Sequence, residues 1–251
     1  IAEEHAVTFA AGLATQGLLP FLVIYSTFLQ RGYDQLIHDV ALQQLKVIFC
    51  IDRAGLVGED GATHQGVFDI AYLRCIPHIE IFAPRNEVEL RNILYTAQLP
   101  EQDKALAIRY PRGYGQLTVW QLPFEKIEKK GVQLREGTRY AVLSVGAIAD
   151  EVAQEINQHP EAEIFAHYDM RWIKPLDEEL LHHVLKKYQA VITVEEGCKA
   201  GGFGESIVVF AKEKGYSLPI RIVAIADVFV EHGSVALQRA FTGLTNFLAE
   251  K

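Results

Sequence analysis

The fold is set by an apolar run and the glycine-rich loop after it, at residues 46–66, which read KVIFCIDRAGLVGEDGATHQG. The run Lys46–Ile51 is almost continuously apolar, as expected for a strand that is covered on both faces. The loop after it holds four glycines in a dozen residues, which allows sharp turns and close backbone approach. Ligands of open α/β sheets bind beyond the carboxyl ends of the strands, so this loop is a candidate binding site.

Outward from this stretch, short apolar runs alternate with longer amphipathic segments. Such alternation predicts crossover units and parallel sheets with helices on both faces. In the first part, the expected strands are Phe21–Tyr25, Lys46–Ile51, Ile79–Phe82 and Leu106–Arg109, and the expected helices are Glu3–Thr15, Phe28–Gln43, Phe68–Arg74 and Glu87–Gln98. In the second part, the expected strands are Tyr140–Ser144, Glu163–Tyr168, Ala190–Val194 and Ile220–Ile225, and the expected helices are Ile148–Asn157, Glu178–Lys187, Glu205–Glu213 and Val235–Leu248. The sequence therefore predicts an α/β protein with two three-layer α/β/α domains and largely parallel sheets.

A change of pattern between Pro111 and Gly137 separates the two parts, since prolines, glycines and a charge cluster replace the apolar runs. We expect domains at residues 1–122 and 137–251, joined by a linker at 123–136. The first domain lacks an opening strand, because the chain begins inside a helix. The single methionine is Met170, so residue 1 is no initiator, and we expect a removed leader or a longer parent protein.

The amino-acid composition limits the classes of protein to which this chain can belong. With 49% hydrophobic and 22% charged residues among 251, the chain is globular rather than disordered, collagenous or a coiled coil. The net charge of -8 argues against a surface that coats nucleic acid, although a local basic pocket for a phosphate stays open. Threonines, a glycine and Pro20 interrupt the uncharged stretch at residues 6–30, so a helix, turn and strand are favoured over a membrane span.

The three cysteines, Cys50, Cys75 and Cys198, provide no disulfide framework and have no metal-ligand spacing. This cysteine usage indicates a reducing, cytoplasmic setting. Residues 201–204, Gly-Gly-Phe-Gly, precede a helix, but Ile207 stands where a dinucleotide fingerprint needs Gly or Ala, so a tight turn is favoured. The pair His182 and His183 lies on a polar helix face and is expected at the surface.

The glycine-rich loop carries three side chains with useful chemistry. Arg53 could hold a phosphate, His64 could transfer a proton near neutral pH, and Asp60 could orient a hydroxyl group or that histidine. The plain alternative is a glycine-rich loop with solvated charges, which composition alone favours.

Other candidates also have plain alternatives. Glu3 is typical of a helix start, where a carboxylate stabilises the dipole. Tyr25, Phe28 and Tyr33 surround Arg31 in the sequence, and packing into the core is the simpler explanation for them. Arg112 could be a second phosphate ligand or a surface charge.

Together these segments resemble a known family. Five motifs in the first part carry the resemblance: IAEEHAVTFAAG (1–12), IYSTFLQR (24–31), the loop at 52–66, YLRCIP (72–77) and RYPRG (109–113). The chain is similar here to the 1-deoxy-D-xylulose-5-phosphate synthases, thiamine-diphosphate enzymes of the transketolase type. In the second part, DMRWIKPLD (169–177), VEEG (194–197), GGFG (201–204) and EHGS (231–234) resemble the C-terminal domain of that family.

The resemblance implies a transferase reaction. Pyruvate is decarboxylated on thiamine diphosphate and joined to D-glyceraldehyde 3-phosphate, and the product feeds isoprenoid, thiamine and pyridoxal synthesis. The resemblance also implies Mg²⁺ as a second cofactor, a cytoplasmic homodimer, and no nucleic-acid or membrane partner.

On the cofactor side, the resemblance implies that Glu3 hydrogen-bonds the aminopyrimidine ring and stabilises its imino form, which removes the thiazolium proton. Phe28 matches the aromatic residue that stacks on the pyrimidine, and Tyr25 and Arg31 match residues that line the same pocket.

On the substrate side, Arg53 and Arg112 match the ligands for the phosphate of the aldehyde. Asp60 and His64 match groups near the acceptor aldehyde and its hydroxyl, where the new alkoxide needs a proton. The catalytic set implied is thus Glu3, His64 and Asp60.

The family has a further N-terminal domain, which is implied to carry the diphosphate site and the magnesium ligands, so we expect no metal ligands in this chain. We accordingly expect this chain alone to be inactive. A split transketolase and a 2-oxo acid dehydrogenase beta subunit have the same two-domain order and stay open as alternatives, as does a non-catalytic dimerisation fragment.

Overall fold

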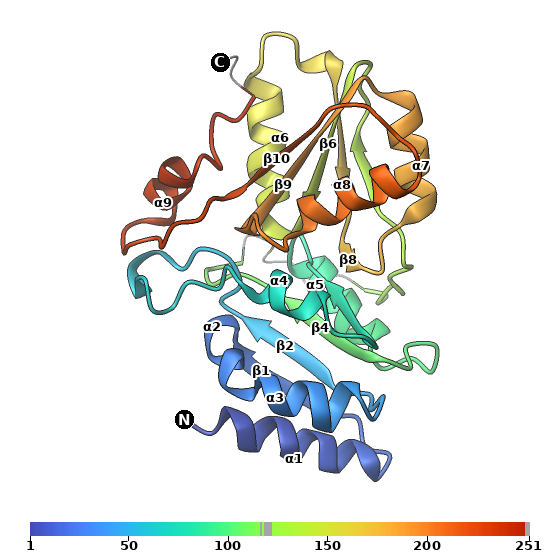
Figure 1. Cartoon of the computed structure of the whole chain (residues 1–251), viewed down its shortest axis with the longest axis vertical. Coiled ribbons are helices and arrows are strands. Elements are labelled where there is room, and N and C mark those ends of the chain that lie inside the picture. Colours follow the sequence, from blue (N-terminus) through green and yellow to red (C-terminus); the bar gives the residue numbers. More distant parts are fainter. Residues whose placement is uncertain (116, 118–121, 249–251) are drawn as a thin grey trace.

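The computed structural model describes residues 1–115, 117 and 122–248, arranged as two α/β halves (Figure 1). The first half consists of α1 (Glu3–Thr15), β1 (Phe21–Tyr25), α2 (Ser26–Leu29), η1 (Gln30–Gly32), α3 (Tyr33–Gln35), η2 (Leu36–Ala41), β2 (Ile48–Asp52), η3 (Gly58–Asp60), α4 (Asp69–Arg74), β3 (Ile79–Phe82), α5 (Glu87–Thr96) and β4 (Ala105–Arg109). The second half consists of β5 (Val132–Arg135), β6 (Tyr140–Val145), η4 (Gly146–Ile148), α6 (Ala149–Gln158), η5 (Ala162–Ile164), β7 (Phe165–Asp169), β8 (Trp172–Lys174), α7 (Glu178–Lys187), β9 (Ala190–Cys198), α8 (Phe203–Glu213), β10 (Ile220–Ile225) and α9 (Val235–Thr242).

Each half contains a five-stranded sheet. The first has the order β1-β2-β4-β3-β8 and the second the order β10-β9-β6-β7-β5. Neighbouring strands are parallel except at one edge of each sheet, where β8 pairs antiparallel with β3 and β5 pairs antiparallel with β7. The predicted largely parallel α/β architecture is confirmed.

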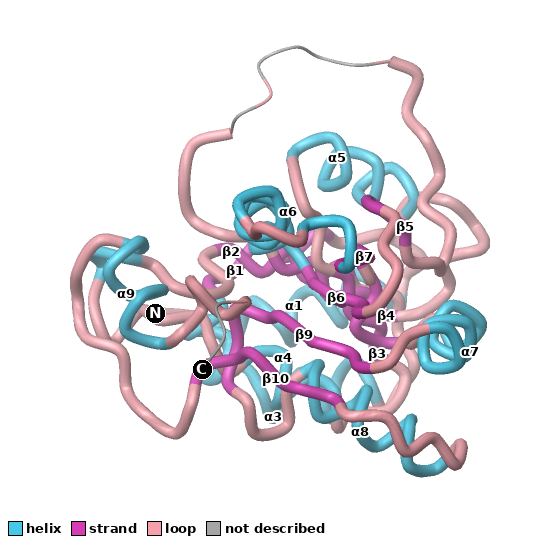
Figure 2. The backbone as a smooth tube through the Cα atoms, turned by 90° about the horizontal axis from the view of Figure 1, so that it is seen from above, coloured by secondary structure: helices cyan, strands magenta, loops and turns pink. Residues whose placement is uncertain are grey.

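Alternate side chains along the central strands face different helices, as the period of two requires. In β6, Leu143 packs in the core cluster that contains α7 and α8, whereas Val142 packs in the cluster that contains α6. Figure 2 shows α6 on one side of this sheet and α7 and α8 on the other. In β2, Phe49 shares a cluster with α1, and Cys50 shares one with α5. Both sheets therefore have helices on both faces.

The two halves are joined by more than the connecting chain. Strand β8 comes from the second half but completes the first sheet. The largest core cluster also continues through both halves, and it includes Leu73 of α4, Ile173 of β8 and Phe203 of α8. Residues 132–135, which lie in the expected linker, form β5. The division at residues 122 and 137 stays a prediction. Residues 116 and 118–121, in the stretch where the sequence pattern changes, lie outside the described residues.

Three local predictions are wrong. The expected regular helix Phe28–Gln43 is a helical run that changes from α to 3-10 to α to π geometry between residues 26 and 41. Within it, Gly32 lets α1 approach closely, since a Cβ there would lie 2.8 Å from Cγ2 of Val7. The expected helix Val235–Leu248 ends at Thr242, because Gly243 adopts the left-handed conformation typical of a helix C-terminus.

The third wrong prediction concerns His182, expected at the surface. It is half-buried, and its Nδ1 lies 2.7 Å from the hydroxyl oxygen of Tyr216. Its neighbour His183 is exposed, as predicted. In the described part of the chain, no helix is long and apolar enough to cross a bilayer.

The last residue of β7 is a buried carboxylate, Asp169. Asp169 is fully buried, and its Oδ1 accepts a hydrogen bond of 3.1 Å from the backbone amide of Arg171. Its Oδ2 has no hydrogen-bond partner among the described residues. Burial, helped by the negative charge of Glu89, raises the pKa of Asp169 to about 8. The native state therefore holds a proton that the unfolded chain releases near pH 4.

The contribution of Asp169 to stability should consequently fall as pH rises from about 4 to 8, because this carboxyl group binds a proton in the native state that it has lost in the unfolded chain. Asp169→Asn cannot ionise, so the free energy of unfolding of this variant relative to wild type should increase with pH, by at most about 1.4 kcal/mol per unit. Denaturant unfolding at pH 5, 6, 7 and 8 measures this difference. Exposed Asp227 provides the control Asp227→Asn, which should follow wild type at every pH. A constant difference between Asp169→Asn and wild type would contradict the prediction.

Candidate active site

The candidate site lies beyond the carboxyl ends of three neighbouring strands of the first sheet. Tyr25 ends β1, Asp52 ends β2 and Arg109 ends β4. Because these strands are parallel and adjacent in the order β1-β2-β4, the loops that follow them meet at one edge of the sheet. The first turn of α1 brings Glu3 to the same place.

A carboxylate, a guanidinium and two aromatic rings form one side of the site. Oε1 of Glu3 lies 3.3 Å from Nη1 of Arg31, and 14% of the glutamate side chain is exposed. The Arg31 guanidinium lies over the ring of Phe28, 5.1 Å from its centroid. Phe28 stacks on Tyr25, with 5.4 Å between centroids and 13° between planes. Phe28 and Arg31 share a face because they are three residues apart in a helical run.

Two arginines held by one carboxylate form the other side. Oδ2 of Asp60 lies 3.6 Å from Nε of Arg53 and 3.1 Å from Nε of Arg112. Arg53 also pairs with Asp52 and lies 3.8 Å from the centroid of the Tyr25 ring. Its backbone has a φ of 57°, a left-handed conformation that turns the chain sharply after β2. The Nε of Arg53 is buried and makes no hydrogen bond to any described residue, so its ion pair with Asp60 at 3.6 Å is its charged contact.

His64 lies against the aromatic side, and the contact of Arg53 with Tyr25 joins the two sides. The His64 ring contacts Phe28 edge-on, with 5.3 Å between centroids, and its Nδ1 lies 2.9 Å from Oγ1 of Thr63. All eight residues expected at the site are thus gathered in one region: Glu3, Tyr25, Phe28, Arg31, Arg53, Asp60, His64 and Arg112. Tyr33 instead packs toward the core, which was the simpler explanation for it. It lies edge-on against Tyr72 and donates a hydrogen bond to the Tyr72 carbonyl.

Two loop glycines are required by close approach. Gly55 and Gly66 form an isolated antiparallel bridge that closes the base of the loop. A Cβ at Gly66 would lie 2.0 Å from the carbonyl oxygen of Arg53, and a Cβ at Gly55 would lie 2.3 Å from Oε2 of Glu196. No side chain fits in either place, which explains the glycine content of the loop.

A buried ion pair lies beneath the site and was not singled out from the sequence. Nε of Arg109 lies 2.8 Å from Oδ2 of Asp69, and its Nη2 donates both to Oδ1 of Asp69 and to the backbone carbonyl of Glu196. Burial alone would lower the pKa of Arg109, but the charge of Asp69 raises it, so the guanidinium stays charged. An arginine at the end of an apolar strand was the available signal, because a charge at such a position needs a buried partner.

The Gly-Gly-Phe-Gly segment forms a turn into α8, as predicted, and Gly201 has a φ of +72°. The carboxylate of Glu195 accepts hydrogen bonds of 2.7 Å from the backbone amides of Phe203 and Gly204. Burial raises the pKa of Glu195 to about 7. A protein carboxylate therefore occupies the helix N-terminus where a dinucleotide phosphate would bind.

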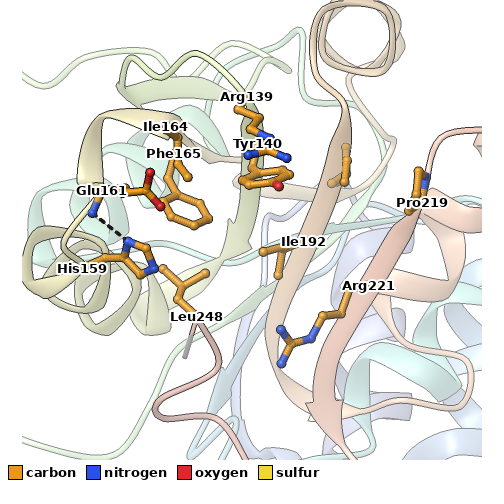
Figure 3. A pocket seen from close by; sticks show the side chains of 12 residues that line it. Arg139, Tyr140, His159, Glu161, Ile164, Phe165, Ile192, Pro219, Arg221 and Leu248 are labelled. Carbon is orange, nitrogen blue, oxygen red and sulfur yellow. Dashed lines mark hydrogen bonds between the residues drawn. The ribbon is translucent and has the colours of Figure 1, made fainter. Parts of the chain in front are cut away.

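A cavity lies elsewhere in the molecule. It measures about 540 Å³ and opens at the amino ends of β6, β7, β9 and β10, where Tyr140, His159 and Arg221 line it (Figure 3). The candidate site lies at the carboxyl ends of the strands in the other sheet, so the two share no residue.

The donor set at the site fits the pyrimidine part of thiamine diphosphate, since a mostly buried carboxylate stands beside a helical turn that presents an aromatic ring. Among the described residues, no group of three or more His, Cys, Asp or Glu side chains could hold a metal ion.

The chain matches two protein families in succession. Residues 1–116 match "Transketolase, pyrimidine binding domain", and residues 129–246 match "Transketolase, C-terminal domain". Among curated relatives, the 1-deoxy-D-xylulose-5-phosphate synthase of Cytophaga hutchinsonii is 52% identical over 94% of this chain and 37% of its own length. The synthase of Bacteroides fragilis is 54% identical over the same shares. The chain thus spans a little over a third of these relatives.

Solved structures agree on the fold. A structure described as "Split gene transketolase, inactive beta4 tetramer" superposes with a TM-score of 0.83 at 28% identity, covering 98% of this chain and 78% of that one. A transketolase from Campylobacter jejuni superposes with a TM-score of 0.77 at 19% identity, covering 99% of this chain and 38% of that chain.

Proposed function

Because this chain belongs to the transketolase family, with a pyrimidine-binding domain followed by a C-terminal domain, we propose that it supplies these domains of a 1-deoxy-D-xylulose-5-phosphate synthase. The observation that carries the proposal is the pairing of Glu3 and Phe28 with a two-arginine group bridged by Asp60. One side suits a pyrimidine ring, and the other suits a phosphorylated aldehyde.

The reaction proposed for the whole protein joins two carbons of pyruvate to D-glyceraldehyde 3-phosphate, with loss of carbon dioxide. Thiamine diphosphate, when bound, supplies the electron sink for this chemistry. Its diphosphate and Mg²⁺ are proposed to be held by the part of the relatives that this chain does not span.

On the cofactor side, the Glu3 carboxyl group is proposed to hydrogen-bond a nitrogen of the pyrimidine ring and to move a proton there. Arg31 fixes the orientation of that carboxylate through its ion pair at 3.3 Å. The Phe28 ring is proposed to pack on the pyrimidine, and Tyr25 holds Phe28 from its other side by stacking.

On the substrate side, Arg53 and Arg112 are proposed to bind the aldehyde phosphate, because guanidinium groups match phosphate oxygens in geometry and charge. Asp60 sets the spacing of the two guanidinium groups by contacting both. His64 is proposed to give a proton to the aldehyde oxygen as the new carbon–carbon bond forms. Its edge-on contact with Phe28, the residue proposed to pack on the pyrimidine, supports this role.

The assembled enzyme is proposed to be a cytoplasmic homodimer. This chain alone is proposed to be inactive, and the description of a structure of similar fold as an "inactive beta4 tetramer" supports this. The division into residues 1–122, a linker at 123–136 and residues 137–251 is likewise a proposal.

An assay of product formation tests the function. The protein that also contains the missing N-terminal domain should release carbon dioxide from pyruvate and form 1-deoxy-D-xylulose 5-phosphate when D-glyceraldehyde 3-phosphate is added. The 251-residue chain alone should form none. Ketol transfer from xylulose 5-phosphate would instead indicate a transketolase, and carbon dioxide release without the sugar product would indicate a 2-oxo acid dehydrogenase. Robust synthesis by the isolated chain would contradict the proposed inactivity.

A further inference from the structure

We propose that Gln238, in the C-terminal half, is a positioning residue that sets the specificity of the site for a phosphorylated aldehyde. This inference rests on the proposed function and extends it to a residue that contacts neither the cofactor side nor the arginines. It starts from the way in which the loop at residues 53–66 is held.

Gln238 lies on α9 and is 3% exposed. Its Oε1 accepts a hydrogen bond of 2.9 Å from the backbone amide of Gly58, and its Nε2 donates one of 3.0 Å to the Gly58 carbonyl. The same Nε2 donates to the carbonyl of Glu231 at 2.8 Å. One side chain thus satisfies both backbone groups of Gly58, although 180 residues separate them.

Gly58 itself fits closely against the start of α9. It has a φ of +66°, and a Cβ there would lie 3.2 Å from Cγ2 of Val235 and 3.3 Å from the Gly233 carbonyl oxygen. A side chain at Gly58 would be strained and would crowd the start of α9, so the loop depends on glycine to lie this close to the helix. With the hydrogen bonds from Gln238, this close approach ties the position of the loop to that of α9.

A second anchor lies two residues earlier in the loop. Oε2 of Glu196 accepts a hydrogen bond of 3.3 Å from the amide of Leu56, while its Oε1 pairs with Nε of Arg239 at 2.8 Å. Arg239 follows Gln238 in α9, and its Nη1 lies 2.6 Å from Oε1 of Glu151 in α6. The ion pairs of Arg239 thus attach helix α9 to β9 and to α6. The hydrogen bonds of Gln238 in turn attach the loop to α9.

The functional consequence follows from the short η3 turn, Gly58–Asp60. Gly58 begins this turn and Asp60 ends it, so a displacement of Gly58 moves the carboxylate that contacts both Arg53 and Arg112. The phosphate ligands then lose their spacing. The loop reaches α2 at its other end, where His64 contacts Phe28 and Thr27 donates a hydrogen bond to the Thr63 carbonyl, so binding of pyruvate should change less than binding of the phosphate.

The test is Gln238→Glu in the protein that carries the missing N-terminal domain. Glutamate keeps the shape of the side chain but turns an oxygen toward the two carbonyl groups that Nε2 now contacts. The preference for D-glyceraldehyde 3-phosphate over D-glyceraldehyde, as a ratio of kcat/KM values, should fall about tenfold or more, as the loss of buried hydrogen bonds implies. The KM for pyruvate should stay within about twofold, since uniform binding on that side is retained. Gln238→Met, which lacks the donors without adding charge, should shift the ratio in the same direction.

The matched control is Glu155→Gln. Glu155 is a carboxylate of the same half that accepts a hydrogen bond of 2.7 Å from the amide of Leu248 and does not contact the loop. This variant should lower thermal stability without changing the preference ratio. An unchanged ratio in both Gln238 variants, or an equal change in Glu155→Gln, would overturn the inference.

Binding of glycerol 3-phosphate, measured by calorimetry, separates this inference from the proposed function. Wild type should bind it more tightly than Gln238→Glu, again by about tenfold. If wild type forms no sugar product but binding still weakens in the variant, the positioning role stands and the synthase assignment fails. Equal affinities of wild type and variant would refute the positioning role whatever the reaction.

Discussion

Replacing Glu3 by glutamine in the complete protein should lower kcat by about 10²- to 10⁴-fold, the range expected when a positioned acid–base group is lost. Glutamine keeps the size of the side chain and can still accept a hydrogen bond from Arg31. Its amide cannot exchange a proton with a pyrimidine nitrogen at neutral pH. The substitution therefore removes the chemistry while it leaves the packing of α1 in place.

The neighbouring residue supplies the control. Glu4 lies in the same first turn of α1 and is exposed, so Glu4→Gln changes the net charge and the helix dipole equally. Initial rates of product formation at saturating pyruvate and aldehyde, with thermal unfolding measured in parallel, compare the two variants. If Glu3→Gln retains wild-type kcat, or if Glu4→Gln loses as much, Glu3 has no catalytic role.

The second large effect is expected on the free energy of unfolding when Arg109 is replaced. Removing one partner of a buried ion pair leaves the other charge uncompensated, which costs about 3–5 kcal/mol. In Arg109→Met, the carboxylate of Asp69 would stay fully buried without its two hydrogen bonds of 2.8 and 3.2 Å. The backbone carbonyl of Glu196 would lose its donor as well. A loss of this size is a large part of the total stability of most domains.

Denaturant unfolding of this chain measures the loss, and Arg112→Met is the matched control. Arg112 is exposed and follows the same strand by three residues, so its removal should change the free energy of unfolding by less than about 1 kcal/mol. Combining Arg109→Met with Asp69→Leu should recover part of the loss, because the buried charge is then gone. Equal effects of Arg109→Met and Arg112→Met would show that the buried pair does not stabilise the fold.

Strands could be predicted from the sequence where an apolar run of sufficient length marks them. Ile79–Phe82 was predicted with the bounds that β3 has, because the residues of this doubly covered strand other than Glu80 are large and apolar. Strand β8, Trp172–Lys174, has three residues and pairs with a strand from the other half, and neither property leaves a local pattern. Gly243 marks the early end of α9, but apolar residues continue beyond it to Leu248, so the sequence pattern extends past the helix.

Prediction of the site residues was limited in the same way to what a local sequence pattern can indicate. Arg53 and His64 could be singled out locally, because they stand in a glycine-rich loop after a buried strand, but their roles came from the resemblance to a family. Gln238 could not be found this way. Its contact with Gly58 joins residues 180 positions apart, and a glutamine on an amphipathic helix gives no pattern that differs from a solvated one. Only the packing of α9 against the loop identifies it.

Strand β8 bears on how such proteins can be inherited. The C-terminal half contributes the edge strand of the N-terminal sheet, and the pairing of Phe82 with Trp172 buries both aromatic rings at 5.0 Å. Loss of the C-terminal half would leave a sheet without its edge strand, and loss of the N-terminal half would leave a strand without its sheet. The two halves should therefore descend as a pair, and a gene break that preserves function belongs ahead of both rather than between them.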